Sequence, residues 1–255
     1  MKWLLLFCLA LALLLVLAYA SRHRIRQAKA FVLNRYVNPR SSTDAITPTP
    51  KDVERHHEFL ERIKRGNIDL VFFGDSITDG WPTAGEQTWS RFAMYNPANF
   101  GVSGERTEHL LWRLQNGELE GLNPKVVVLL IGTNNIGAVQ YERPEWVFRG
   151  IQKIVETIRS RLPNATIVLQ AIFPRDTSNS EQRKRVAEVN EKIVKLADGK
   201  KIIFADFGAS FLDANGEISP DVMPDGLHLT AKGYDIWYQQ LAPLLAKLMA
   251  EPKPR

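Results

Sequence analysis

Three residues of this chain have the side chains of a nucleophile, a base and an orienting carboxylate: Ser76, His228 and Asp225. Ser76 follows the apolar run from Leu70 to Phe73 almost directly, so it stands where a buried strand would end. A serine hydroxyl needs a base that removes its proton during attack. Asp225 precedes His228 by three residues, so one short loop can supply both the base and the carboxylate that orients it. These residue types fit nucleophilic acyl transfer. The alternatives are a serine that caps the next helix and a surface histidine before a helix cap.

The other histidines of the chain are less well placed to act as the base. The sequence contains five histidines. His23 lies in a basic N-terminal stretch, and His56 and His57 precede the first predicted strand. His109 falls one turn into a predicted helix, where a solvated or capping role is expected. The scarcity of histidine therefore favours His228.

Acyl transfer also needs hydrogen-bond donors directed at the developing oxyanion, and two loops offer them. Gly104, in Gly101-Val102-Ser103-Gly104, allows close approach of the backbone N–H to a substrate. Asn134 follows a buried strand through Gly132, so its side-chain amide is a further candidate donor. The alternative for Gly-Thr-Asn-Asn is ordinary turn chemistry, which these residues favour by themselves.

Strand-like and helix-like patterns alternate along the chain. Apolar runs predict strands at 69–73, 98–102, 125–131, 166–172 and 201–205. Between them, apolar residues recur with helical spacing, as in Ile151, Ile154, Val155, Ile158 and Leu162. A last helix is expected after Thr230, a suitable N-cap. This alternation predicts a three-layer α/β/α sandwich around a five-stranded parallel sheet, in which the candidate residues follow strand ends at one edge.

Composition and missing motifs exclude several other functions. The net charge of +5 is matched by five basic residues near the N-terminus: Arg22, Arg24, Arg26, Lys29 and Arg35. The rest of the chain is therefore nearly neutral, and nucleic acid is not an expected partner. Cys8, the one cysteine, lies in an N-terminal apolar run, which leaves no thiol for disulfides, catalysis or zinc in the remainder. Phosphate-loop, dinucleotide, zincin and Gly-x-Ser-x-Gly patterns are absent. We therefore expect neither a metal nor a cofactor.

The N-terminal residues suggest a membrane or export segment. Residues 3–20 form an uninterrupted apolar run, which fits a cleaved signal peptide ending at Ala18-Tyr19-Ala20 or a transmembrane anchor. The basic cluster that follows would keep the next segment in the cytoplasm. We expect a membrane-associated or exported protein. The sequence leaves both sides of the membrane open for the domain, and we favour the periplasmic or extracellular side.

The domain organisation predicted from these patterns has four parts. Residues 1–20 are the signal or anchor, and 21–50 are a basic flank followed by a linker rich in Pro, Ser and Thr. Residues 51–250 form the catalytic domain and 251–255 a tail.

Four ordered motifs then resemble the blocks of the SGNH (GDSL) hydrolases: Gly74-Asp75-Ser76, Gly104, Gly-Thr-Asn134-Asn and Asp225-x-x-His228. Two longer segments are similar to the catalytic subunits of platelet-activating-factor acetylhydrolase and their bacterial relatives. They are Asn-Phe-Gly-Val-Ser-Gly-Glu-Arg-Thr-Glu-His and Leu-Trp-Arg-Leu-Gln-Asn-Gly-Glu-Leu. The resemblance spans about residues 58 to 248. It implies a flavodoxin-like sheet, a Ser76–His228–Asp225 triad, and an oxyanion hole from the Ser76 and Gly104 N–H groups plus the Asn134 amide.

The function that the resemblance implies is hydrolysis of short-chain esters, acetyl esters above all, through an acyl-enzyme. The expected substrate is a small lipid or sugar acetyl ester, and a homodimer is compatible with the resemblance. Two alternatives stay open. One is a carbohydrate-specific O-acetylesterase. The other is an inactive, membrane-tethered binding module, against which the intact Ser76, Asn134, Asp225 and His228 argue.

Overall fold

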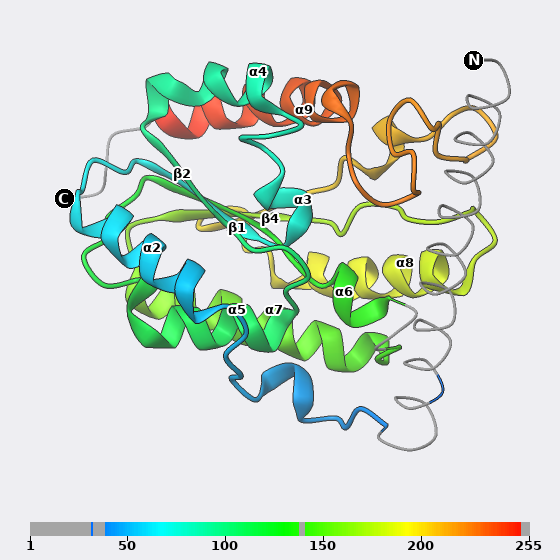
Figure 1. The fold of residues 1–255 in the computed structure, drawn as a ribbon, viewed down its shortest axis with the longest axis horizontal. Helices are drawn as coiled ribbons and strands as arrows, with labels where there is room; N and C mark the ends of the chain where they lie inside the picture. The colour runs from blue at the N-terminus through cyan, green and yellow to red at the C-terminus, as the bar shows by residue number, and fades with distance from the viewer. Residues whose placement is uncertain (1–31, 33–38, 138–140, 251–255) are drawn as a thin grey trace, which may run out of the picture.

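The computed structural model describes residue 32 and residues 39–137 and 141–250; the N-terminal apolar run at 3–20 and the basic cluster after it lie outside these residues. Within the described residues, five parallel strands form one sheet in the order β2-β1-β3-β4-β5 (Figure 1). The strands are β1 (Leu70–Gly74), β2 (Pro97–Gly101), β3 (Val126–Leu130), β4 (Thr166–Gln170) and β5 (Ile202–Ala205).

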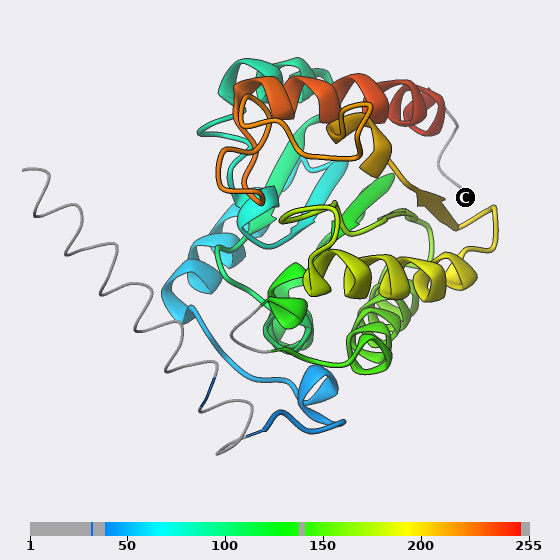
Figure 2. The ribbon, with the colours of Figure 1, turned by 90° about the vertical axis from the view of Figure 1, so that its right-hand side faces the viewer.

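Helices cover both faces of this sheet. One face carries α2 (Val53–Lys64), α5 (Thr107–Arg113), α7 (Pro144–Arg161) and α8 (Glu181–Ile193), and the other carries α4 (Glu86–Trp89), η3 (Ser90–Tyr95) and α9 (Ala231–Ala250). Figure 2 shows α9 on one side of the sheet and α8 on the other. The described residues also include short helical segments: η2 (Asp44–Ile46), α3 (Ser76–Asp79), η4 (Leu114–Glu118), α6 (Thr133–Ile136), η5 (Val194–Leu196) and η6 (Gly208–Phe211).

The sheet is buried because its strands are apolar on both faces. All five residues of β1 and all five of β3 are buried. Side chains at alternate positions divide between two cores: Val71 and Phe73 pack with α5 and α7, while Leu70 and Phe72 pack with α9. Near-continuous apolar runs of this kind are typical of parallel sheets covered on both sides.

The predicted fold class is confirmed. Each of the five predicted strands overlaps an observed strand, and the ends differ by one or two residues at most. The largest difference is the strand predicted at 166–172, which ends at Gln170. Ala171 still donates to the Ala205 carbonyl (2.9 Å), but the Ile172 N–H donates to the Asn190 side chain instead of to β5 (2.8 Å). Thr230 lies at the start of α9, where its hydroxyl accepts the Gly233 N–H (3.3 Å).

The order of the strands creates a switch point between β1 and β3. From β1 the chain crosses to β2 on one side, and it then returns to β3 on the other side of β1. The loops that leave the carboxyl ends of β1 and β3 therefore diverge, and the opening between them is where α/β sheets bind ligands.

Residues 41–50, which the sequence predicts to be a linker, pack against the helical layer. Ala45 in η2 is fully buried, and its carbonyl accepts the hydroxyl of Thr107 at the start of α5 (2.9 Å). None of the helices in the described residues is long and apolar enough to span a bilayer.

Candidate active site

Ser76 occupies the first turn of α3, directly beyond the carboxyl end of β1. Asp75 is the N-cap of α3, and its Oδ1 accepts the Ile77 N–H (3.0 Å). Gly74 is required at the end of β1, because a Cβ there would stand 2.1 Å from the Thr78 hydroxyl and 2.4 Å from the Leu130 carbonyl oxygen. The strand therefore turns sharply into the helix and presents Ser76 at the sheet edge, where it is partly exposed.

The loop before α9 brings His228 to this serine. His228 Nε2 lies 3.0 Å from the Ser76 Oγ, and His228 Nδ1 lies 2.6 Å from Asp225 Oδ2. The other carboxylate oxygen of Asp225 accepts the N–H groups of His228 (2.8 Å) and Leu227 (3.0 Å). The three residues that the sequence singled out are thus in hydrogen-bond contact in the order serine, histidine, aspartate, which is the geometry of an activated nucleophile.

The Asp225 carboxylate is well suited to stay ionised. Partial burial raises its pKa, but the hydrogen bonds from the His228 ring and backbone outweigh this effect and hold the pKa below the ordinary value. The side chains of Asp225 and His228 are about half exposed, at 54% and 49%. An ionised carboxylate in this position favours the histidine tautomer whose Nε2 can accept a proton from serine.

Gly104 lies in a tight turn after β2. The Glu105 N–H donates to the Val102 carbonyl (3.2 Å), and Gly104 in the third position has a φ of +73°. Glycine adopts this conformation without the strain that a Cβ would introduce. Lys51 fixes the same turn from the N-terminal side, where its Nζ donates to the Ser103 carbonyl (2.6 Å).

Asn134 lies in α6, directly beyond the carboxyl end of β3, and is partly exposed. Its Nδ2 donates to the backbone carbonyl of Glu105 (2.8 Å), which ties α6 to the Gly104 turn. A primary amide has two hydrogens, so this bond leaves the second N–H of Asn134 available for an oxyanion. The structure therefore brings together the loops of Ser76, Gly104 and Asn134 around the switch point.

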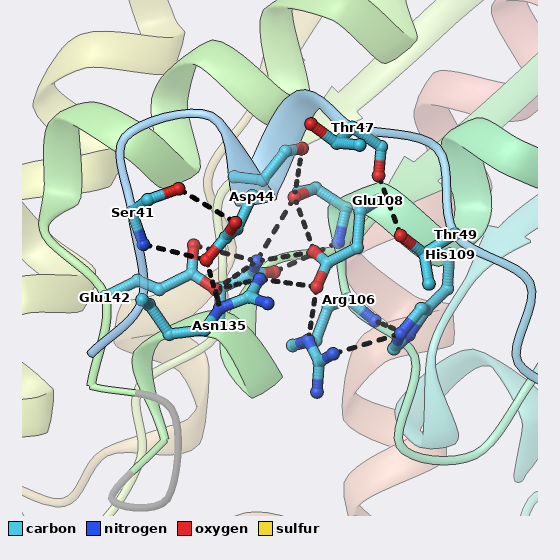
Figure 3. A network of polar contacts seen from close by, with 12 residues as sticks. Ser41, Asp44, Thr47, Thr49, Arg106, Glu108, His109, Asn135 and Glu142 are labelled. Carbon is cyan, nitrogen blue, oxygen red and sulfur yellow. Dashed lines mark hydrogen bonds and ion pairs between the residues drawn. The ribbon is translucent and has the colours of Figure 1, made fainter. Parts of the chain in front are cut away.

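The neighbouring Asn135 is fully buried and belongs to a polar network beneath the site (Figure 3). Its Oδ1 accepts the Thr107 N–H (3.0 Å), and its Nδ2 lies 3.2 Å from both Glu108 Oε2 and Glu142 Oε1. Arg40 completes the network by contacting both buried glutamates. Asn135 therefore joins α6 to α5, and Arg40 supplies a positive charge from the N-terminal segment.

Asp75 carries the most strongly raised carboxyl pKa near the nucleophile. Its side chain is almost completely buried, and burial raises its pKa to about 7 despite the Ile77 N–H and the nearby His228. A carboxyl beside the nucleophile that titrates near neutrality is an unusual feature of a helix cap.

Comparison with known proteins then identifies the family of this chain. Residues 72–236 match the GDSL-like lipase/acylhydrolase family, a stretch that includes Ser76, Gly104, Asn134, Asp225 and His228. The chain belongs to the GDSL-like lipase/acylhydrolase family. As a member of this GDSL family it is an acylhydrolase, an enzyme that cleaves ester bonds.

Individual relatives of this GDSL protein include an enzyme subunit and solved structures. It is 36% identical over 217 residues to human platelet-activating factor acetylhydrolase IB subunit alpha1, which covers 81% of this chain and 91% of the subunit. A GDSL-like lipase structure from Bacteroides thetaiotaomicron superposes with a TM-score of 0.64 at 20% identity, covering 75% of this chain and 97% of that one. A carbohydrate esterase family 3 structure from Talaromyces cellulolyticus superposes with a TM-score of 0.54 at 20% identity, covering 71% and 98%. The last two likenesses concern the fold.

Other side chains that could take part in binding or catalysis have structural positions instead. Trp81 and Trp237 are completely buried in the core beside α9, so they do not line a substrate pocket. His109 is buried and accepts the Arg106 N–H at its Nδ1 (3.1 Å) in a capping role, and burial lowers its pKa to about 4. Within the described part of the chain, no three His, Cys, Asp or Glu side chains cluster as metal ligands would.

The sequence patterns do not indicate the polar groups that support the site. Gly-Thr-Asn-Asn favours a turn by itself, and nothing in the sequence links Asn135 to the carboxylates of Glu108 and Glu142. One usable signal is Arg113, which pairs with the buried Glu105. Arg113 follows Leu110 by three residues and so stands on a helical stripe that is otherwise apolar.

Proposed function

We propose that the protein is a serine esterase that cleaves short-chain esters, acetyl esters above all, with Ser76 as nucleophile, His228 as general base and Asp225 as its orienting carboxylate. The observation that carries the proposal is the contact between Ser76 Oγ and His228 Nε2 at 3.0 Å, with Asp225 on the opposite ring nitrogen. That arrangement supplies a base for the serine proton and a counter-charge for the imidazolium that forms.

The mechanism follows from these positions. Ser76 Oγ attacks the ester carbonyl while its proton passes to His228 Nε2. The N–H groups of Ser76 and Gly104 and the free amide hydrogen of Asn134 stabilise the resulting oxyanion. His228 then protonates the departing alcohol, which leaves an acyl group on Ser76. Water attacks that acyl group with His228 again acting as base, and release of the carboxylic acid restores the serine.

The preference for a short acyl group is supported by the acetylhydrolase relatives, whose names state the acyl group that they remove. A panel of p-nitrophenyl esters from acetate to octanoate measures this preference. Acetylated xylan and acetylated sialic acid in the same panel test for a carbohydrate alcohol. A kcat/KM that rises steadily with acyl length would overturn the short-chain proposal.

Ser76 is tested by substitution and covalent labelling. Ser76→Ala is expected to abolish hydrolysis of p-nitrophenyl acetate and labelling by a fluorophosphonate probe, with little change in thermal unfolding. Ser210→Ala, which alters an exposed serine in η6, is the matched control and is expected to keep both properties. Retained activity in Ser76→Ala would contradict the assignment.

We also propose that the N-terminal apolar run associates the enzyme with a membrane or directs its export. The support is the sequence of residues 3–20 and the basic cluster after it. Cell fractionation followed by N-terminal sequencing of the purified protein tests this proposal. A full-length protein found entirely in the cytosolic fraction would contradict it.

A further inference from the structure

A second buried charge cluster lies behind the Gly104 turn. Its centre is Arg113, at the end of α5, whose side chain is 1% exposed. The guanidinium binds Glu105 with two nitrogens, Nε at 2.9 Å and Nη2 at 2.7 Å, and Nη2 also donates to the Phe100 carbonyl at 3.0 Å. Its remaining nitrogen, Nη1, binds Glu118.

Glu105 joins this cluster to the site. Its side chain is held by Arg113, and its backbone carbonyl accepts the Asn134 amide at 2.8 Å. Its own N–H closes the turn that contains Gly104. The two proposed oxyanion donors outside α3 are the Gly104 N–H and the Asn134 amide. The positions of both therefore depend on the position of Glu105.

The guanidinium fixes Glu105 more rigidly than a single contact would. A planar fork that binds a carboxylate with two parallel hydrogen bonds defines both its distance and its orientation. The further bond to Phe100 anchors the same fork to the end of β2. Because the cluster is removed from water, the carboxylate has few other partners and its position is well determined.

We propose that Glu105, held by Arg113, is a positioning residue of the oxyanion hole: it fixes the carbonyl that directs the free N–H of Asn134 toward the developing charge. This inference rests on the proposed esterase function. A donor that is already oriented stabilises the transition state without reorganisation, so the predicted effect falls on kcat.

The test compares two isosteric substitutions in the same cluster. Glu105→Gln removes the carboxylate that Arg113 holds and keeps the backbone carbonyl that Asn134 contacts, and we expect kcat for p-nitrophenyl acetate to fall about tenfold with KM little changed. Glu118→Gln is the matched control, because Glu118 is equally buried and contacts Arg113 and His56 but neither loop of the site. It is expected to lower thermal stability comparably while kcat stays within about threefold. Equal kcat losses in both variants would overturn the proposal.

A double-mutant cycle separates positioning from general loosening. Asn134→Ala is expected to lower kcat about 100-fold, as loss of one oxyanion donor does. If Glu105 acts through Asn134, adding Glu105→Gln to Asn134→Ala lowers kcat no more than about twofold further. A full tenfold further loss would show that Glu105 acts by another route. If Glu105→Gln does not fold, Arg113→Lys, which keeps the charge and loses the fork, takes its place in the cycle.

Failure of the inference and failure of the proposed function give different results. If the unaltered chain hydrolyses p-nitrophenyl acetate and Ser76→Ala does not, an unchanged kcat in Glu105→Gln overturns the positioning role alone. If the unaltered chain neither hydrolyses the ester nor reacts with the fluorophosphonate probe, the proposed function and the inference fail together.

Discussion

The carboxylate of Asp225 holds His228 at two points, the ring and the backbone. Oδ2 lies 2.6 Å from the ring Nδ1, and Oδ1 accepts the backbone N–H at 2.8 Å. The second contact fixes the position of the loop, and the first fixes the orientation and tautomer of the imidazole. These two functions of one carboxylate respond differently to substitution.

Replacing Asp225 by Asn should therefore be milder than removing His228. The Asn oxygen can still accept the backbone N–H of His228, so the loop is expected to keep its position, but an amide N–H facing Nδ1 favours the wrong tautomer. Water can solvate the imidazolium because both side chains are about half exposed. We expect kcat/KM to fall about 10⁴-fold in Asp225→Asn and about 10⁶-fold in His228→Ala. Equal losses, measured with p-nitrophenyl acetate, would contradict the division of roles.

Asp75 predicts a specific dependence of stability on pH. Burial raises its pKa from 3.8 to about 7 in the folded protein. The unfolded chain therefore loses this proton at lower pH than the folded protein does. The contribution of Asp75 to stability is complete below pH 3.8 and is lost progressively as pH rises to about 7.

The variant Asp75→Asn lacks this titration and keeps a side-chain oxygen that can accept the Ile77 N–H. Its free energy of unfolding, relative to the unaltered protein, is expected to rise by up to about 4 kcal/mol between pH 4 and pH 7. Urea denaturation at several pH values measures the difference. Asp235→Asn, which removes a carboxylate that pairs with Arg91 on α9, is the control substitution away from the nucleophile. A difference that stays constant with pH would refute the assignment.

The fold and the three catalytic candidates could be predicted from the sequence because their signals are local. Apolar runs such as Leu70 to Phe73 mark buried parallel strands. Three of the four motifs fall just past strand ends, and the fourth lies in the loop before α9. The supporting groups could not be predicted in this way. Arg113 and Glu105 are eight residues apart, but Arg40 meets Glu142 from 102 residues away, and charged residues usually indicate solvent. Such pairs become visible only when the packing of the helices is known.

Arg40 provides the last prediction, because it connects the segment before the domain to the network beneath Asn134. Its Nε lies 2.7 Å from Oε1 of the fully buried Glu142. Burial raises the pKa of Glu142, and the positive charge of Arg40 limits that rise. Removing Arg40 would leave a buried carboxylate with the Asn135 amide as a weaker partner.

We expect Arg40→Met to lower the free energy of unfolding by about 3 kcal/mol at pH 7.5, the cost of breaking a buried ion pair. The loss should shrink toward pH 5, because Glu142 without its cation is protonated in the folded protein and no longer carries a buried charge. Arg55→Met is the matched control: Arg55 pairs with exposed Glu58, and its removal should cost less than about 1 kcal/mol. Chemical denaturation of the full chain at both pH values checks the prediction. A loss in Arg40→Met that is no larger than in Arg55→Met would mean that residues 39–50 do not stabilise the domain through this contact.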